Sequence, residues 1–328
     1  MAQNIRVHTI ALGPDSDFDV LNNIANRTGT GAVNTVESAA DLHKLHEIYY
    51  SIIGGAGCGG MVHLNSTSMT QTLTESVVID STTREAHFAY SWQASGAEFE
   101  CVLRDPAGTT YTANSPEVFH FRGSTHAFYR VTRPVGGTWK VALRVKKNPT
   151  DQALKITTAA LADSDVRSRV TLDRKSLIRG KIGLDLAVLA GNRPVTSGRA
   201  TAAVTFPTIS IRDLLRKHAT ELEKIRISPA ALGRDKGNVG HIRLGIFAAR
   251  QAALGKDIYL RKTVNLALQD DGKAHDKKAG DGRYSGVLDV KANKIAGNFR
   301  IRVEFQGRHS AFGKCRCVHL LPVYVPEA

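Results

Sequence analysis

The sequence IRVHTIALGP, residues 5–14, decides how the rest of the chain is interpreted. Its apolar, β-branched residues end at a glycine-proline pair, which predicts a short, mostly buried strand. Residues 15–29 have the caps and apolar spacing of a helix. Residues 31–36 predict a second strand, and a second helix is expected to begin at Ser38. The expected buried stripe of this second helix is Leu42, Leu45, Ile48, Tyr49 and Ile52.

This order of strand, helix, strand and helix predicts one parallel crossover with a closing helix. Parallel sheets are normally covered by helices on both faces, and two strands provide too little sheet for that arrangement. About 50 residues also bury little apolar surface on their own. Residues 1–53 are therefore expected to be part of a larger α/β domain. The alternative is a small module that is complete in itself.

Four short pieces of this segment resemble the last third of a von Willebrand factor type A domain. They are VHTIALG at 7–13, LNNIA at 21–25, TG at 28–29 and ADL at 40–42. The resemblance implies that the chain is the C-terminal part of a longer protein. The type A domain binds a metal ion through an Asp-x-Ser-x-Ser loop after its first strand, and no residue here corresponds to that loop. The resemblance therefore carries over a fold and no site residue.

The composition is that of an ordinary globular protein, with 328 residues of which 42% are hydrophobic and 23% are charged. Two or three domains are expected at this length. No run approaches the roughly 18 apolar residues of a membrane-spanning helix, and the first residues lack the features of an export signal. The parent protein is expected to be extracellular, periplasmic or at the cell surface, with any signal upstream.

The formal net charge of +14, from 44 basic and 30 acidic residues, would suit an anionic partner. However, the basic residues are spread from Arg167 to Arg316 and form no arm, helix-turn-helix or aromatic stacking set. Nucleic acid is therefore disfavoured as a partner. The expected partner is a protein or a glycan that the sequence does not identify.

The four cysteines are too few for a disulfide framework. Cys315 and Cys317 are two residues apart in an expected strand, where a bridge between them would be strained. Nothing in the sequence pairs Cys58 or Cys101. Packed or free thiols are expected, and the pairing of the four stays open.

Residues 54–60 are rich in glycine and are expected to form a linker. They include GAGCGG at 55–60, which matches the dinucleotide fingerprint G-x-G-x-x-G but follows a helix instead of a strand. Over residues 61–163 the hydrophobic period changes to two, which predicts an antiparallel β-sandwich. Trp92 and Trp139 are expected in its core. The expected strands are residues 71–79, 85–92, 99–104, 109–111, 125–131 and 138–145.

Residues 164–328 predict a second sandwich of immunoglobulin or fibronectin type, with a helical insertion at 207–257. Ser210 and Asp213 have the spacing of a capping box at the start of the insertion. The apolar helical face that follows, Ile211, Leu214, Leu215, His218, Leu222 and Ile225, is expected to lie on the sandwich. The expected strands are residues 182–189, 198–206, 263–268, 284–290, 297–305 and 318–325. The predicted fold class is thus mainly β, with two sandwiches preceded by a partial α/β segment.

Pieces of the first predicted sandwich are similar to the β-sandwich that follows the type A domain in calcium-activated chloride channel regulators and related bacterial surface proteins, and segments of the second extend the same family resemblance. These pieces are YSW at 90–92, LRDPAG at 103–108, PVGGTWKV at 134–141, and segments within 192–198 and 270–286. Together with the type A pieces, the resemblance covers most of the chain apart from the helical insertion.

HEIYY at residues 46–50 begins like the zinc-protease motif H-E-x-x-H, but Tyr50 cannot replace the second histidine ligand. His43 and His46 lie one helical turn apart and could share a metal, although two solvated side chains are the simpler interpretation. The sequence contains no G-x-S-x-G elbow, phosphate loop or supported Cys-His pair. An enzyme is therefore disfavoured.

The densest cluster of acids and glycines is DDGKAHDKKAGDGRY at residues 270–284. Glycines let a loop fold back so that carboxylates and carbonyls converge, as a hard cation such as calcium requires. The candidate calcium ligands are Asp270, Asp271, Asp276 and Asp281. The spacing does not match an EF-hand, and Asp-Gly pairs also make tight turns. A structural turn is therefore the preferred interpretation, and a calcium cofactor bound by these acids is the alternative.

These observations favour a non-enzymatic binding or adhesion protein, in which two sandwiches form a stalk or recognition surface behind a type A domain. The alternative is a regulatory or accessory subunit whose partial type A segment is completed by another chain. The two differ in one expectation: a subunit with an obligate partner should associate or aggregate when isolated.

Overall fold

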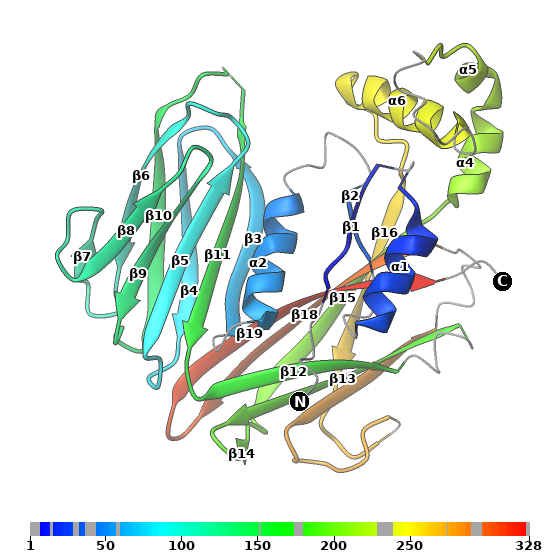
Figure 1. Ribbon diagram of the computed structural model, residues 1–328. Coiled ribbons are helices and arrows are strands. Elements are labelled where there is room, and N and C mark those ends of the chain that lie inside the picture. Colours follow the sequence, from blue (N-terminus) through cyan, green and yellow to red (C-terminus); the bar gives the residue numbers. More distant parts are fainter. Residues whose placement is uncertain are drawn as a thin grey trace.

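A computed structural model describes residues 7–13, 16–28, 33–36, 44–56, 60–150, 152–173, 180–227, 239–273, 275–289 and 297–325. The protein is mainly β, with two groups of antiparallel sheets side by side (Figure 1). Two helices belong to the N-terminal segment, and a group of helices from residues 211–253 lies at one end of the molecule. Ser38, Leu42, His43 and Cys58 lie outside the described residues. Among the described helices, none has both the length and the hydrophobicity of a membrane-spanning segment.

The N-terminal segment has the predicted order of elements. These are β1 (Ile10–Leu12), α1 (Phe18–Arg27), β2 (Asn34–Val36) and α2 (Lys44–Ala56). β1 and β2 pair in parallel and form a two-stranded sheet. The Asp17 carboxylate caps α1 by accepting a hydrogen bond from the Val20 amide at 3.0 Å.

Helix α2 extends further than the sequence suggested. It ends at Ala56 and the next strand begins at Gly60, so Gly54 and Gly55 are helical and do not belong to a linker. A Cβ atom at Gly54 would lie 3.2 Å from the Cβ of Met61. Glycine at this position therefore permits close packing of the helix against the first sandwich. Its role here is its small size, and not its backbone flexibility.

The first sandwich consists of two antiparallel sheets. One has the order β3 (Gly60–Met69), β11 (Leu154–Asp163), β5 (Glu85–Trp92), β9 (His126–Thr132) and β8 (Val118–Arg122). The other has the order β4 (Thr72–Ile79), β10 (Gly137–Lys147), β6 (Glu98–Arg104) and β7 (Thr110–Tyr111). Trp92 and Trp139 are buried in the core, as predicted. The Trp139 indole donates to the Val135 carbonyl at 2.8 Å, and its ring lies 5.3 Å from that of Phe88.

The second sandwich also has two sheets. One contains β12 (Val166–Asp173), β13 (Lys181–Ala190), β14 (Arg193–Pro194) and β17 (Arg283–Asp289). The other has the order β16 (Arg261–Leu268), β15 (Gly198–Pro207), β18 (Gly297–His309) and β19 (Gly313–Val325). Cys315 and Cys317 are buried free thiols in this sandwich, and Cys101 is one in the first. The expectation of packed thiols is confirmed for these three.

The two sandwiches meet where β19 packs beside β3, with helix α2 against both strands (Figure 1). A small apolar cluster joins them, and its buried members are Met61, Leu64, Ala159 and Val318, with Tyr50 of α2 packed against it. The Arg302 guanidinium of β18 donates to the Leu64 carbonyl of β3 at 2.6 Å. An ion pair between Glu47 and Arg300 attaches α2 to β18.

The helical insertion contains α4 (Ile211–Lys217), α5 (Ala219–Glu223) and α6 (Val239–Ala253). The predicted capping box is present: the Ser210 hydroxyl accepts from the Asp213 amide at 3.1 Å and donates to the Asp213 carboxylate at 2.8 Å. The prediction that the apolar face lies on the sandwich is wrong. It packs against α6 instead, in a separate core of Leu214, Leu222, Ile225, Leu244, Ala248 and Tyr259, because α6 offers a complementary apolar face.

Candidate metal site

The loop at residues 269–282 connects β16 to β17 at the edge of the second sandwich. Its two ends are fixed by a pair of backbone hydrogen bonds between Gln269 and Ser285, at 2.9 and 2.8 Å. The Gly282 carbonyl accepts from the Val188 amide at 3.0 Å, which ties the loop to β13. The loop therefore begins and ends on rigid strands.

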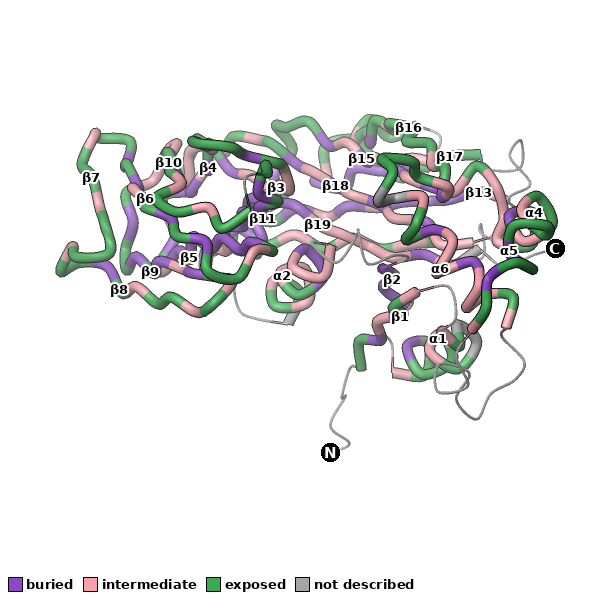
Figure 2. Tube along the Cα trace, turned by 90° about the horizontal axis from the view of Figure 1, so that it is seen from above, coloured by how far each residue is buried: buried purple, intermediate pink, exposed green. Residues whose placement is uncertain are grey.

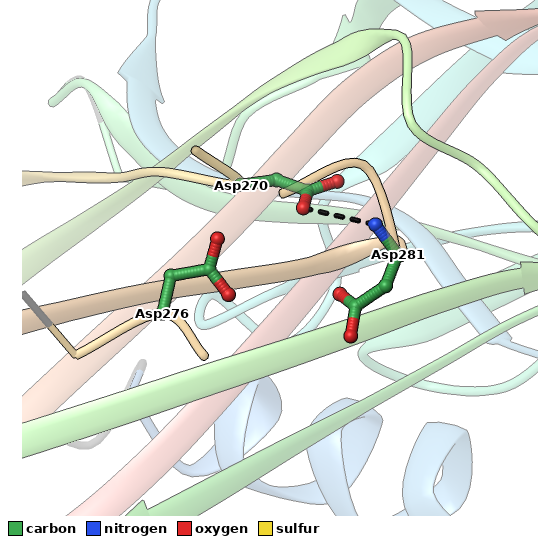
Figure 3. Close-up of side chains that lie close together, drawn as sticks. All are labelled: Asp270, Asp276 and Asp281. Carbon is green, nitrogen blue, oxygen red and sulfur yellow. Dashed lines mark hydrogen bonds between the residues drawn. The ribbon is translucent and has the colours of Figure 1, made fainter. Parts of the chain in front are cut away.

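Three of the four acids predicted from the sequence converge in this loop (Figure 3). Each of Asp270, Asp276 and Asp281 offers a carboxylate oxygen, and these three oxygens lie within 4.8 Å of one another. Asp276 is buried, with 6% of its surface exposed, and the other two are half-buried. The fourth acid, Asp271, is exposed and does not belong to the group; its carboxylate accepts from the Lys273 amide at 3.0 Å.

Backbone amides hold the converging carboxylates in place. The two oxygens of Asp270 accept from the amides of Asp281 and Gly282 at 3.1 and 3.0 Å. The two oxygens of Asp276 accept from the amides of Gly272 and Lys278 at 2.6 and 3.3 Å. These bonds alone account for a structural turn. Because each carboxylate oxygen has more than one lone pair, they also leave capacity for a cation.

Two glycines give the loop its tight path. Gly272 and Gly282 have φ angles of 70° and 77°, which side chains other than glycine rarely adopt. A Cβ atom at Gly282 would lie 2.7 Å from the Cβ of Pro194. The convergence of the acids thus depends on glycine at this position, as the sequence pattern indicated.

The donor set fits a hard cation. Three carboxylates provide as many as six oxygens, and calcium takes about six to eight oxygen ligands with tolerant geometry. Burial, together with the negative charge of Asp270, raises the pKa of Tyr284 to about 12. The Tyr284 hydroxyl therefore stays protonated and donates to the Val195 carbonyl at 2.9 Å. The three acids of the group are buried or half-buried, while Lys273, Lys277 and Lys278 of the same loop are exposed.

A partly buried polar cluster at the junction of the sandwiches was not predicted. Glu304 accepts from Arg302 at 2.5 Å and from Arg316 at 2.9 Å. His63 lies beside them, 3.2 Å from the Thr158 hydroxyl, and is 4% exposed. Burial, with the positive charges of Arg316 and Arg302, lowers the pKa of His63 to about 4. These residues come from distant strands, so no local pattern in the sequence could have brought them together.

An aromatic surface on β8 and β9 was also missed. Phe119 and Phe121 are 50% and 44% exposed, and their rings lie 5.9 and 5.6 Å from that of Phe128. The Arg130 guanidinium lies 4.9 Å above the Phe119 ring. The alternation in the sequence VFHFR could have revealed this strand, although it does not tell which face is exposed.

The partial zinc-protease motif has a structural role. Glu47 is 7% exposed and forms its ion pair with Arg300, while His46 is half-buried on the same helix. His43 lies outside the described residues, so the two-histidine metal hypothesis is not tested.

No protein-family model matches the chain, and no curated protein matches it. One similar solved structure is that of the lipase BlEst2 from Bacillus licheniformis in its propeptide form, with 11% sequence identity and a TM-score of 0.41 over 83% of this chain and 42% of that one. A DUF4785 family protein from Legionella pneumophila is 9% identical, with a TM-score of 0.41 over 81% of this chain and 64% of that one. A tetra-tandem repeat from the extending region of a large adhesion protein is 10% identical, with a TM-score of 0.21 over 79% of this chain and 50% of that one. The chain spans less than two thirds of each of these structures.

Proposed function

We propose that this chain is a non-enzymatic binding or adhesion module whose second sandwich holds a calcium ion in the loop between β16 and β17. The observation that carries the proposal is the convergence of the Asp270, Asp276 and Asp281 oxygens within 4.8 Å. The ion would join the two ends of the loop and make it a rigid feature at the edge of the sandwich. Ligand contact would then occur across exposed sandwich loops, with no chemical step.

The chemistry of the loop suits an environment rich in calcium. Three carboxylates held close together repel one another, and a divalent cation offsets that repulsion. Extracellular calcium modules bind with dissociation constants of about 10⁻⁴ to 10⁻³ M. A partly exposed loop that also carries lysines fits this weak range. The parent protein is accordingly proposed to be extracellular, periplasmic or at the cell surface, with a type A domain ahead of the sandwiches.

Thermal unfolding with calcium and with chelator tests the proposal. Calcium at about 10 mM, about 100 times a dissociation constant of 0.1 mM, should stabilise the protein by about 2.7 kcal/mol relative to chelator. Magnesium at the same concentration controls for ionic strength. Calorimetry should show calcium binding in the same range. Identical unfolding curves, with no heat of binding at millimolar calcium, would leave the loop as a structural turn.

Two isosteric variants separate the metal from the turn. Asp281→Asn removes one charge from the group but keeps a carbonyl oxygen that can accept from the Arg283 amide, now bound at 3.0 Å. Asp271→Asn is the matched control, because it makes the same charge change in the same loop outside the group. The calcium affinity should fall at least 10-fold in Asp281→Asn, and the stabilisation by calcium should fall with it. Asp271→Asn should keep both. Equal loss in both variants would indicate general charge attraction.

A second candidate is an accessory subunit whose N-terminal segment is completed by another chain. The observation in its favour is the parallel pair of β1 and β2, which forms a sheet of only two strands among the described residues. Val20 and Ile24 of α1 are also 52% and 38% exposed. Light scattering after size-exclusion chromatography, at low micromolar concentration, should then show association that Val20→Lys and Ile24→Lys abolish. A single monomeric species would exclude this candidate.

A further inference from the structure

Strand β8 is the free edge of the five-stranded sheet in the first sandwich. Among the described strands it pairs with β9 alone. Natural edge strands are usually protected by short length, charged side chains, proline or a bulge, because their unpaired backbone groups accept another strand. The sequence of β8, VFHFR, contains no proline, carries one charged side chain at its last residue, Arg122, and has two exposed phenylalanines in its middle. Figure 2 shows β8 at the outer end of the molecule, away from α2 and the second sandwich.

The hydrogen-bond register identifies which backbone groups of β8 face outward. The Gly123 amide donates to the His126 carbonyl at 2.8 Å, so these two residues form a hydrogen-bonded pair with β9. Bonded and non-bonded pairs alternate in an antiparallel ladder, so Phe121 and Phe119 are also bonded to β9. The backbone groups of His120 and Arg122 therefore point away from the sheet.

The side chains of β8 are self-complementary. If a second copy of β8 pairs antiparallel with the first about a two-fold axis at His120, Phe119 of each copy stands opposite Phe121 of the other on one face. Such non-bonded pairs bring side chains closest together. The His120 backbones would exchange hydrogen bonds, and the Arg122 amide of each copy would face the Val118 carbonyl of the other. Arg122, the one charged residue of the strand, would stand opposite Val118 of the other copy, so the two guanidinium groups do not face each other.

We propose that the β8 edge is a self-association surface, through which two copies of this chain join their five-stranded sheets into one continuous sheet. In each copy the Phe128 ring packs beside Phe119 and enlarges the aromatic surface. The Arg130 guanidinium lies above the Phe119 ring at its margin. This proposal does not depend on the calcium loop or on the proposed function. A short strand and a few aromatic rings bury less area than a standard interface, so the dimer is weak and reversible.

The net charge of +14 predicts how the association depends on salt. Two copies repel each other at low ionic strength, and salt screens that repulsion. Association should therefore strengthen with salt. An association with an acidic partner peptide, which is the competing occupant, would instead weaken with salt.

Sedimentation equilibrium of the full chain at about 5–500 µM tests the proposal. A reversible monomer-dimer equilibrium is expected, tighter at 0.5 M than at 0.05 M sodium chloride. Phe121→Lys should weaken it more than 10-fold, because it places a charge in the aromatic contact. Leu189→Lys is the matched control, since Leu189 is 41% exposed on β13 and Phe121 is 44% exposed. Both positions are on the surface, so folding should be retained, as circular dichroism can verify.

Hydrogen exchange distinguishes strand pairing from contact between faces. The His120 amide should exchange more slowly as concentration rises, and His120→Pro, which removes that outward donor, should abolish the dimer. A monomer at every concentration overturns the proposal. So does a dimer that Leu189→Lys weakens as much as Phe121→Lys, or a dimer in which exchange of the His120 amide is unchanged.

Discussion

The first sandwich and the helical insertion each have an apolar core of their own, and the two cores differ in size. The core of the sandwich draws on strands from both of its sheets and includes two tryptophans that are at most 1% exposed. Among the described residues of the insertion, the core has six buried side chains, which lie on α4, α5, α6 and neighbouring loops. The lesson is that loss of one side chain should unfold a large unit in the first case and only a local unit in the second.

Replacing Trp139 with alanine should have the largest effect and test the global side of this comparison. Its ring is fully buried and packs against Phe88, so the free energy of unfolding should fall by about 3–5 kcal/mol. Urea unfolding followed by circular dichroism measures the loss. Val135→Ala, at a half-exposed position in the adjacent turn, should change stability by less than about 0.5 kcal/mol. A loss below 1 kcal/mol for Trp139→Ala would contradict a closely packed core.

Acid should weaken the contact between the two sandwiches through His63. Its pKa is about 4 in the folded protein against 6.5 ordinarily, so the unfolded chain takes up a proton first as pH falls from 6.5 to 4. Stability is therefore lost on acidification in this window, by about 3 kcal/mol at about 1.4 kcal/mol per pH unit. The groups facing His63 are Glu75 on β4, Glu304 and Arg302 on β18, and Arg316 on β19.

His63→Gln should remove this part of the pH dependence, because glutamine can still form a hydrogen bond with the Thr158 hydroxyl but does not titrate. The measurement is the slope of the unfolding free energy against pH from 6.5 to 4, in wild type and variant. His275→Gln, at an exposed position of the β16–β17 loop, is the control. If the slope for His63→Gln equals that of the wild type, His63 does not couple the sandwiches to pH.

The smallest expected effect lies in the insertion. Ser210→Ala removes the hydroxyl that caps α4 and should cost about 1 kcal/mol locally. Amides of α4 and α6 should exchange faster, while exchange in the first sandwich stays unchanged. Thr220→Ala, an exposed position in α5, serves as the comparison. Faster exchange across the first sandwich as well would show that the insertion is not an independent unit.

Periodicity predicted many of the strands and helices, but their neighbours were harder to infer. β5 spans residues 85–92, as the alternation indicated. β3, β8, β11 and β12 were not predicted. In β3 and β12, Ser, Thr and Arg fill positions that face the junction or solvent. The face of α4 and α5 was recognised, yet nothing in its own pattern indicates that α6 covers it. An amphipathic helix specifies that it has a partner, and tertiary structure decides which one.

The candidate site was predictable to a similar extent. Glycine and aspartate spacing pointed to a loop that folds back, and three of the four acids do converge. Asp271 does not, because its own carboxylate is engaged by the amide two residues later in a local turn. The junction residues and the β8 edge depend on strands that are remote in sequence, which a single chain cannot reveal by local pattern.

The pairing of β3 with β11 has a consequence for how the protein is made. Ser66 and Thr157 on these strands lie 91 residues apart, and their hydroxyls are 2.8 Å from each other. The first sandwich can therefore close once Asp163 has left the ribosome, and it requires no strand beyond it. From Asp163 to Val325, the last residue of β19, 162 residues remain (325 minus 163). At about 5–20 residues per second, translation of that stretch takes about 8–30 s. During this time the first sandwich can be folded while the second sandwich is still incomplete.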